Sequence, residues 1–268
     1  MNIQHWSTEK IIARVLSNKN QKNYWNYITE LRRRVNEEVY NHAYNLTKSS
    51  IDKEKILGIY ILAQLGFNPR FQQKKTVKRY FAMLQKEQSP KVLAALFSSI
   101  AHNNTDLNEV QIAKLASFTN HSYADVRFEL ALALSCIEQQ TAIHSLIQLA
   151  KDKHHDVRNW ATFGLGSQIE TDTTEIRNTL WHNIEDTDQD VRFEAMVGLA
   201  KRKDQRIVAI LKTKLETLDE DSYDVLEAIE ALQDTTFIPL LTAKINSKNV
   251  NKHWLECAKE TIQVLNKC

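Results

Sequence analysis

The residues best suited to chemistry in this sequence form one short cluster, His154-His155-Asp156. Two imidazoles and a carboxylate are ligands that zinc accepts, and zinc needs three or four ligands at about 2.0–2.3 Å. Adjacent residues in a tight turn rarely converge on one ion, so we expect a solvated turn and no metal site. No glycine-rich phosphate loop, HExxH or GxSxG motif occurs in the sequence. The sequence thus predicts no catalytic centre and no cofactor, and we expect the protein not to be an enzyme.

Positive charge is concentrated in the first third of the chain. Residues 1–86 hold 16 Lys and Arg against 6 Asp and Glu, whereas the remaining residues hold 19 and 27. A basic surface can neutralise phosphates in a salt-dependent manner, but it can also complement an acidic protein or simply be solvated. Helical spacing would place Lys74, Lys75, Lys78 and Arg79 of this basic segment on one face of a helix. The candidate basic patch consists of Arg32, Arg33, Arg34, Arg70, Lys74, Lys75, Lys78 and Arg79.

The elements that position these residues should be helices. The 268 residues include only 5 Gly and 3 Pro, too few to supply the tight turns of sandwiches, barrels or parallel α/β folds. No apolar run approaches the roughly 18–20 residues of a membrane span, and the first residues do not form a signal peptide. Cys136, Cys257 and Cys268 are odd in number and include no CxxC pair. A reduced, cytoplasmic location is therefore expected.

Three segments of the sequence align without gaps, beginning at Asp125, Asp156 and Asp190. If the following Val is position 0, positions +4, +7 and +8 are apolar or small in all three. This spacing defines one face of an α-helix, and the small residue at +7 would let a neighbouring helix approach closely. Weaker copies have their position 0 at 57, 92 and 224, and a last degenerate unit begins near Trp254.

A second helical stretch lies between successive copies, for example Asn108–Phe118, Thr141–Ala150, Thr174–Ile184 and Gln205–Leu215. Each unit is therefore expected to be a helix–turn–helix. The predicted fold is an all-α, right-handed α-solenoid of about six to seven such repeats with atypical terminal caps. We expect one domain, with a basic N-terminal cap at 1–48, repeats at 49–245 and a C-terminal cap at 246–268.

The pattern acidic-x₄-Val-Arg-x₂-Ala-x₂-Gly-Leu, which begins at Asp152, resembles HEAT repeats, particularly the HEAT-like repeats shared with phycobilisome bilin lyases. The stretches 156–168, 174–177 and 194–200 are similar to a bacterial group of HEAT-repeat proteins without assigned function. The resemblance covers roughly residues 50–245. It implies the fold and says little about chemistry, because the shared residues are those that build the repeat.

An acidic residue recurs six positions before +1 in five of the six units. The residues at this position are Asp52, Glu87, His121, Asp152, Asp186 and Asp219. We expect each carboxylate to cap the following helix. The three central units carry Arg127, Arg158 and Arg192 at +1, and we predict a structural ladder in which each Arg bridges the turn carboxylates of its own and a neighbouring repeat.

Positions +2, +3 and +6 of the second helices should face away from the core, towards the concave groove of a HEAT-like array. These positions combine aromatic side chains with two glutamates, a composition typical of binding surfaces. Packing of position +6 between adjacent helices is the structural alternative. The candidate groove residues are Phe128, Glu129, Leu132, Asn159, Trp160, Phe163, Phe193, Glu194 and Val197.

The function best supported by the sequence is a non-catalytic interaction module or scaffold that binds a protein or peptide in this groove. One alternative is a bilin-lyase-like enzyme, which only the repeat resemblance suggests. Another is DNA binding through the basic patch, or a HEAT-like alkylpurine DNA glycosylase, since Trp160 between Glu129 and Glu194 is similar to an aromatic–acidic site. The negative charge around these residues should repel DNA, so nucleic acid is the less favoured partner. No membrane association is expected.

Overall fold

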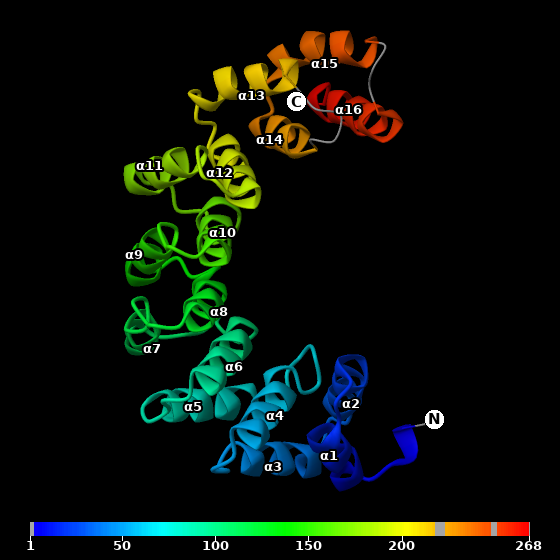
Figure 1. Cartoon of the computed structure of the whole chain (residues 1–268), viewed down its shortest axis with the longest axis vertical. Coiled ribbons are helices and arrows are strands. Elements are labelled where there is room, and N and C mark those ends of the chain that lie inside the picture. The colour runs from blue at the N-terminus through cyan, green and yellow to red at the C-terminus, as the bar shows by residue number, and fades with distance from the viewer. Residues whose placement is uncertain (1–2, 218–222, 248–250, 268) are drawn as a thin grey trace. The chain divides into compact units, whose positions relative to one another are not determined.

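The computed structural model describes residues 3–217, 223–247 and 251–267, and over these residues the secondary structure is entirely helical (Figure 1). The helices form two compact units, Met1–Ala142 and Ile143–Cys268, and the boundary lies inside helix α9 (Gln140–Leu149). The prediction of an all-α repeat fold is confirmed. The single-domain organisation stays a prediction.

The first unit consists of a short N-terminal helical pair followed by three helical hairpins. Its short 3₁₀ turn η1 is Ile3–His5, and its helices are α1 (Thr8–Ser17), α2 (Gln21–Arg33), α3 (Glu37–Leu46), α4 (Asp52–Ala63), α5 (Gln73–Leu84), α6 (Pro90–Ala101), α7 (Glu109–Ala116) and α8 (Ala124–Leu134). The hairpins are α3–α4, α5–α6 and α7–α8, and their second helices stack in the order α4, α6, α8 (Figure 1).

The second unit, taken by itself, is also built from helical hairpins. Its elements are α10 (His155–Phe163), the π-helical turn η2 (Gly164–Gln168), α11 (Thr174–Asn183), α12 (Gln189–Lys201), α13 (Ile207–Glu216), α14 (Asp224–Leu232), the 3₁₀ turn η3 (Thr235–Phe237), α15 (Ile238–Ile245) and α16 (Lys252–Leu265). The hairpins α11–α12, α13–α14 and α15–α16 are formed here, and the second helices stack in the order α10, α12, α14, α16.

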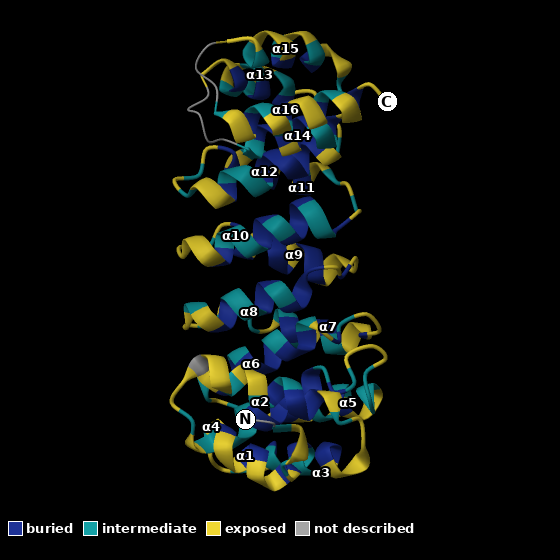
Figure 2. Ribbon diagram, turned by 90° about the vertical axis from the view of Figure 1, so that its right-hand side faces the viewer, coloured by how far each residue is buried: buried dark blue, intermediate teal, exposed yellow. Residues whose placement is uncertain are grey.

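The core of each unit is built from the repeated helical positions. At 0, +4, +7 and +8 of the three strong copies every residue is buried, and Val126, Val157 and Val191 have no exposed surface. Buried residues therefore lie along the inward stripe of each helix, whereas the turns at the helix ends are largely exposed (Figure 2). The helical period predicted from the sequence is confirmed at these positions.

The small residue at +7 has a direct structural role in the second unit. A Cβ added to Gly198 on α12 would lie 2.5 Å from the Cα of Gly166 in η2, and one added to Gly166 would lie 2.9 Å from the carbonyl oxygen of Glu194. Real Cβ atoms do not approach backbone this closely. The two backbones can therefore meet only because both positions lack a side chain.

The acidic residues of the turns bind the backbone of the N-cap residue and not the amides of the first helical turn. Glu87, Asp152 and Asp186 each accept a hydrogen bond of 2.9 Å from the backbone N–H two residues later. Those donors, Ser89, His154 and Asp188, are themselves the N-cap residues of α6, α10 and α12. The prediction that the carboxylates cap the first-turn amides was wrong, because they order the turn that leads into the helix. Asp219 lies outside the described residues.

The predicted cap boundaries divide hairpins. Helices α3 and α4 pair, and α15 and α16 pair, so the cuts at 48/49 and 245/246 each separate two helices that pack together. The atypical N-terminal element is shorter than predicted: it is the pair α1–α2, which packs on α4. At the N-terminal end the cut leaves the first helix of a hairpin, α3, in the cap, and at the C-terminal end it leaves the second helix, α16, in the cap.

No helix in the described parts of the chain is both long and apolar enough to cross a membrane. Cys136 is exposed and Cys257 is half-buried, whereas Cys268 lies outside the described residues.

Candidate interaction surface

Arg158 links two consecutive repeats of the second unit. Its Nε and Nη2 atoms donate to the two carboxylate oxygens of Asp186, both at 2.7 Å, and its Nη1 donates to the backbone carbonyl of Asp152 at 2.9 Å. Arg158 is thus held by its own turn through a carbonyl and by the next turn through a bidentate ion pair.

The same own-turn contact recurs at the other two arginines. The Nη1 atoms of Arg127 and Arg192 donate to the backbone carbonyls of His121 and Asp186, at 2.6 and 2.7 Å. The predicted link to the carboxylate of the same repeat was therefore wrong for Arg158 and Arg192, whose own-turn contacts go to the backbone carbonyls of Asp152 and Asp186. Burial alone would raise the pKa of Asp186, but hydrogen bonds from Arg158 and the Asp188 amide outweigh it and hold that pKa below its usual value.

The candidate basic patch does not form one exposed surface. Arg32 is 9% exposed and its guanidinium donates to the carbonyl of Tyr60 at 2.6 and 2.9 Å. Arg34 pairs with Glu30 and donates to the carbonyls of Trp6 and Ile3. These two arginines join α2 to its neighbours, and assigning them to a phosphate-binding patch was wrong.

The remaining members of the basic patch differ in exposure. Arg79 donates to the hydroxyl and the carbonyl of Thr47, both at 2.8 Å, and Arg70 is half-buried. Arg33, Lys74, Lys75 and Lys78 are exposed. Two hollows of about 360 and 350 Å³ flank α5, and Lys78 lines both of them.

The groove residues of the first unit lie on α8. Phe128, Glu129 and Leu132 are all half-buried. Burial, reinforced by the nearby carboxylate of Asp125, raises the pKa of Glu129 even though Ser98 on α6 contributes an opposing hydrogen bond. The carboxyl group of Glu129 is therefore partly removed from water by the surrounding residues of the first unit.

In the second unit, α10 and α12 carry the other groove residues. Asn159, Trp160, Phe163, Phe193 and Glu194 are half-buried. The rings of Trp160 and Phe163 meet edge to face, with centroids 5.5 Å apart and planes at 87°. Val197 is only 1% exposed, so its placement in the groove was wrong: position +6 on α12 packs into the core.

Glu194 has the most perturbed acidity on this surface. Burial and the repulsion of Glu227 on α14, with a smaller effect of Asp190, raise the pKa of Glu194 to about 7. Lys201 and a 3.5 Å hydrogen bond from Ser167 oppose the rise without cancelling it. Glu227 was not selected from the sequence, although it occupies the +3 position of the weak copy that starts at 224.

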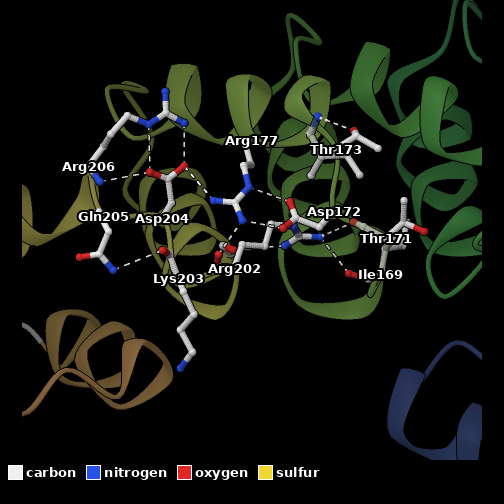
Figure 3. Close-up of polar contacts among 12 residues, drawn as sticks. Ile169, Thr171, Asp172, Thr173, Arg177, Arg202, Lys203, Asp204, Gln205 and Arg206 are labelled. Carbon is white, nitrogen blue, oxygen red and sulfur yellow. Dashed lines mark hydrogen bonds and ion pairs between the residues drawn. The ribbon is translucent and has the colours of Figure 1, made fainter.

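A second polar cluster joins the ends of the helices in the second unit (Figure 3). Arg202, the residue after α12, donates to the carbonyls of Leu165 and Ile169, at 2.7 and 2.9 Å. Asp204 accepts from Arg206 at 2.6 Å and lies 3.3 Å from Arg177. A hollow of about 460 Å³ opens beside Arg202. No repeated position in the sequence signals this cluster, because its members other than Arg177 of α11 lie in turns.

Comparison with known proteins agrees with this architecture. Residues 143–233 match a family model described as HEAT repeats. Protein YibA of Escherichia coli K12 is 37% identical over 119 residues, which are 44% of this chain and 41% of YibA, and YibA of strain O157:H7 aligns equally. The curated relatives are thus matched over less than half of their own length.

Similar solved structures cover more of the chain. The crystal structure of E. coli YibA superposes with a TM-score of 0.73 at 24% identity, covering 99% of this chain and 94% of that one. An engineered protein gives a TM-score of 0.53 at 13% identity, with 96% and 78% covered. Together with the buried periodic positions, these matches show an all-helical repeat fold similar to that of the bacterial protein YibA, in which residues 143–233 match HEAT repeats.

Proposed function

We propose that this protein is a non-catalytic interaction module, and that its second unit holds a basic segment of a partner protein on the face formed by α10, α12 and α14. One observation carries the proposal. Trp160, Glu194 and Glu227 occupy the same repeat position, +3, on three second helices that pack in succession. Equivalent positions on stacked helices form a row, so one extended segment can contact all three.

The side chains of this row suit a cationic, partly apolar segment. The edge-to-face pair of Trp160 and Phe163 offers a half-buried aromatic surface. Aromatic faces bind the guanidinium and ammonium groups of Arg and Lys through cation–π attraction, and aromatic residues frequently dominate the energy of interfaces. The neighbouring carboxylates of Glu194 and Glu227 supply the opposite charge for such groups.

The acidity of Glu194 adds a specific expectation. Its pKa of about 7 reflects burial and nearby negative charge, both of which an arriving cation would offset. Binding of a basic segment should therefore release a proton from Glu194 around neutral pH. It follows that affinity should rise between pH 6 and pH 8, and that a Glu194→Gln variant should lose this dependence.

The test uses a fluorescein-labelled peptide of alternating Lys, Arg and Leu, and a matched peptide with Glu in place of Lys and Arg. Fluorescence anisotropy should show binding of the basic peptide only. We expect Trp160→Ala, and separately E194Q with E227Q, to weaken it about tenfold, which is about 1.4 kcal/mol.

A matched control variant removes the same number of negative charges at a different part of the surface. Glu185 and Glu216 are exposed carboxylates outside this face, so E185Q with E216Q should leave the affinity unchanged. Equal weakening by both double variants would indicate general attraction to an acidic protein and would contradict the proposed surface.

DNA binding and a bilin-lyase-like activity remain the alternatives. Lys74, Lys75 and Lys78 are the exposed lysines that a phosphate backbone could meet on α5. A salt-titrated binding assay with duplex DNA and a triple Ala variant of these lysines addresses the first alternative. A large loss of affinity in that variant, with a reduced salt slope, would favour nucleic acid over a protein partner.

A further inference from the structure

The turn that leads into α10 brings potential metal ligands together, contrary to the expectation from sequence. One ligand atom each of His154, His155 and Asp156 lie within 4.8 Å of one another. The Nδ1 atoms of His154 and His155 are each 3.5 Å from an oxygen of Asp156, and the two imidazole rings stack with their planes 12° apart. The two rings therefore lie side by side, and each Nδ1 faces a different oxygen of the same carboxylate.

The next repeat contributes a fourth group. Oδ2 of Asp188 lies 3.2 Å from Nδ1 of His155. The other oxygen of Asp188, Oδ1, accepts from the backbone N–H groups of Asp190 and Val191 as the N-cap of α12. This cap fixes the carboxylate and leaves Oδ2 directed at His155, in the way that outer contacts orient the ligands of metal sites.

We propose that His154, His155, Asp156 and Asp188 form a binding site for a divalent transition-metal ion of the zinc type, which joins the start of α10 to the N-cap of α12. In a tetrahedral site with bonds of about 2.0–2.1 Å, two ligand atoms are separated by about 3.3 Å. The three histidine-to-carboxylate distances of 3.2, 3.5 and 3.5 Å are close to that value, with the two to Asp156 made to its two different oxygens. Two neutral imidazoles and two carboxylates also balance the charge of a dication.

The carboxylates of the proposed site form no ion pair with Lys or Arg among the described residues. The neighbouring carboxylate, Asp186, is held by both guanidinium contacts of Arg158. Among the described residues, the ion pairs of Asp156 and Asp188 are formed with these histidines alone. An imidazole Nδ1 facing a carboxylate can bind a metal once its proton has left.

Isothermal titration calorimetry with Zn²⁺ on the whole chain tests the site. We expect one binding event that His155→Ala weakens at least about tenfold, since even outer contacts of metal sites are worth 10–100-fold. D188N should weaken it as well, while an Asn at this position still caps α12 through its side-chain oxygen. Unfolding temperatures measured without metal should show that both variants are folded.

The control is the other cluster of this kind among the described residues, Glu9, Glu38 and His42. Since it offers only one imidazole, His42→Ala should leave the Zn²⁺ affinity unchanged. Absence of binding, or binding that H155A and D188N do not weaken, overturns the proposal. Co²⁺ provides a second readout: intense visible d–d absorption in the wild type, lost in H155A, indicates the tetrahedral geometry, and a weak octahedral spectrum contradicts it.

Discussion

Asp204 is 4% exposed at the start of the turn before α13, and it accepts charged hydrogen bonds. The hydrogen bonds from Arg206, with further attraction from Arg177, lower the pKa of Asp204 to about 2. A carboxyl whose pKa is lower in the folded state stabilises the fold above its unfolded pKa of about 3.9, and this stabilisation is lost as pH falls towards 2. The contribution at neutral pH is on the order of 2 kcal/mol.

We therefore expect D204N to reduce the free energy of unfolding by about 2 kcal/mol at pH 7 and by little at pH 2. Urea denaturation at a series of pH values measures both. D106N, at an exposed site in the first unit, is the control and should change little. A loss that stays constant from pH 2 to pH 7 would show that the ion pairs are not its source.

For Glu194 we expect stability to change with pH in the opposite direction. Its pKa is raised to about 7, so ionisation of Glu194 progressively destabilises the fold as pH rises from about 4.5 to 7. E194Q should therefore stabilise the protein at pH 8, by on the order of 1 kcal/mol once solvent screening of a half-buried group is allowed for. At pH 4 the variant and the wild type should have equal stability. Thermal unfolding of the variant and the wild type at pH 4 and pH 8 measures both differences. An unfolding temperature of E194Q at or below that of the wild type at pH 8 would contradict the prediction.

At the scale of the elements, the contact of α12 with η2 depends on the absence of two side chains. Gly198→Ala would place a Cβ 2.5 Å from the Cα of Gly166, so the elements must separate. We expect a loss of about 1–3 kcal/mol, the usual cost of overpacking, measured by urea denaturation. In an uncrowded helix the same change is favourable by about 1 kcal/mol, so a gain in stability would disprove the close approach.

The sequence predicts helices better than it predicts sites. A helix depends on residues that are near one another in the sequence, whereas a site depends on contacts between residues far apart in it. Val157, Ala161 and Leu165 repeat at helical spacing, and their burial follows from one helix having one inward face. Arg32 carries no such signal, since its partner is a carbonyl 28 residues later in the chain. Arg202 also escapes prediction, because several of the carbonyls that it binds lie in and just after the π-helical turn, more than 30 residues earlier in the chain. The metal ligands meet for a similar reason: Asp188 comes from the following repeat.

For the whole molecule, the relevant feature is the division of helices into two compact units. In repeat proteins each element contacts only its neighbours, so a local change is felt mainly nearby. We expect G198A to increase amide hydrogen exchange across α10–α14 and to leave exchange in α3–α6 at the wild-type rate. Equal acceleration in both segments would show that the chain unfolds as a single cooperative body.

The link from Arg158 to Asp186 has a consequence for how such a chain can grow. The repeat that begins at Val157 directs the Arg158 guanidinium to the Asp186 carboxylate of the next turn, and 34 residues separate Val157 from Val191. A tandem duplication of that segment would regenerate the same ion pair at the new junction without any further substitution. The array is therefore open to lengthening or shortening by whole repeats, whereas an insertion of another length between Arg158 and Asp186 would separate these two half-buried charges.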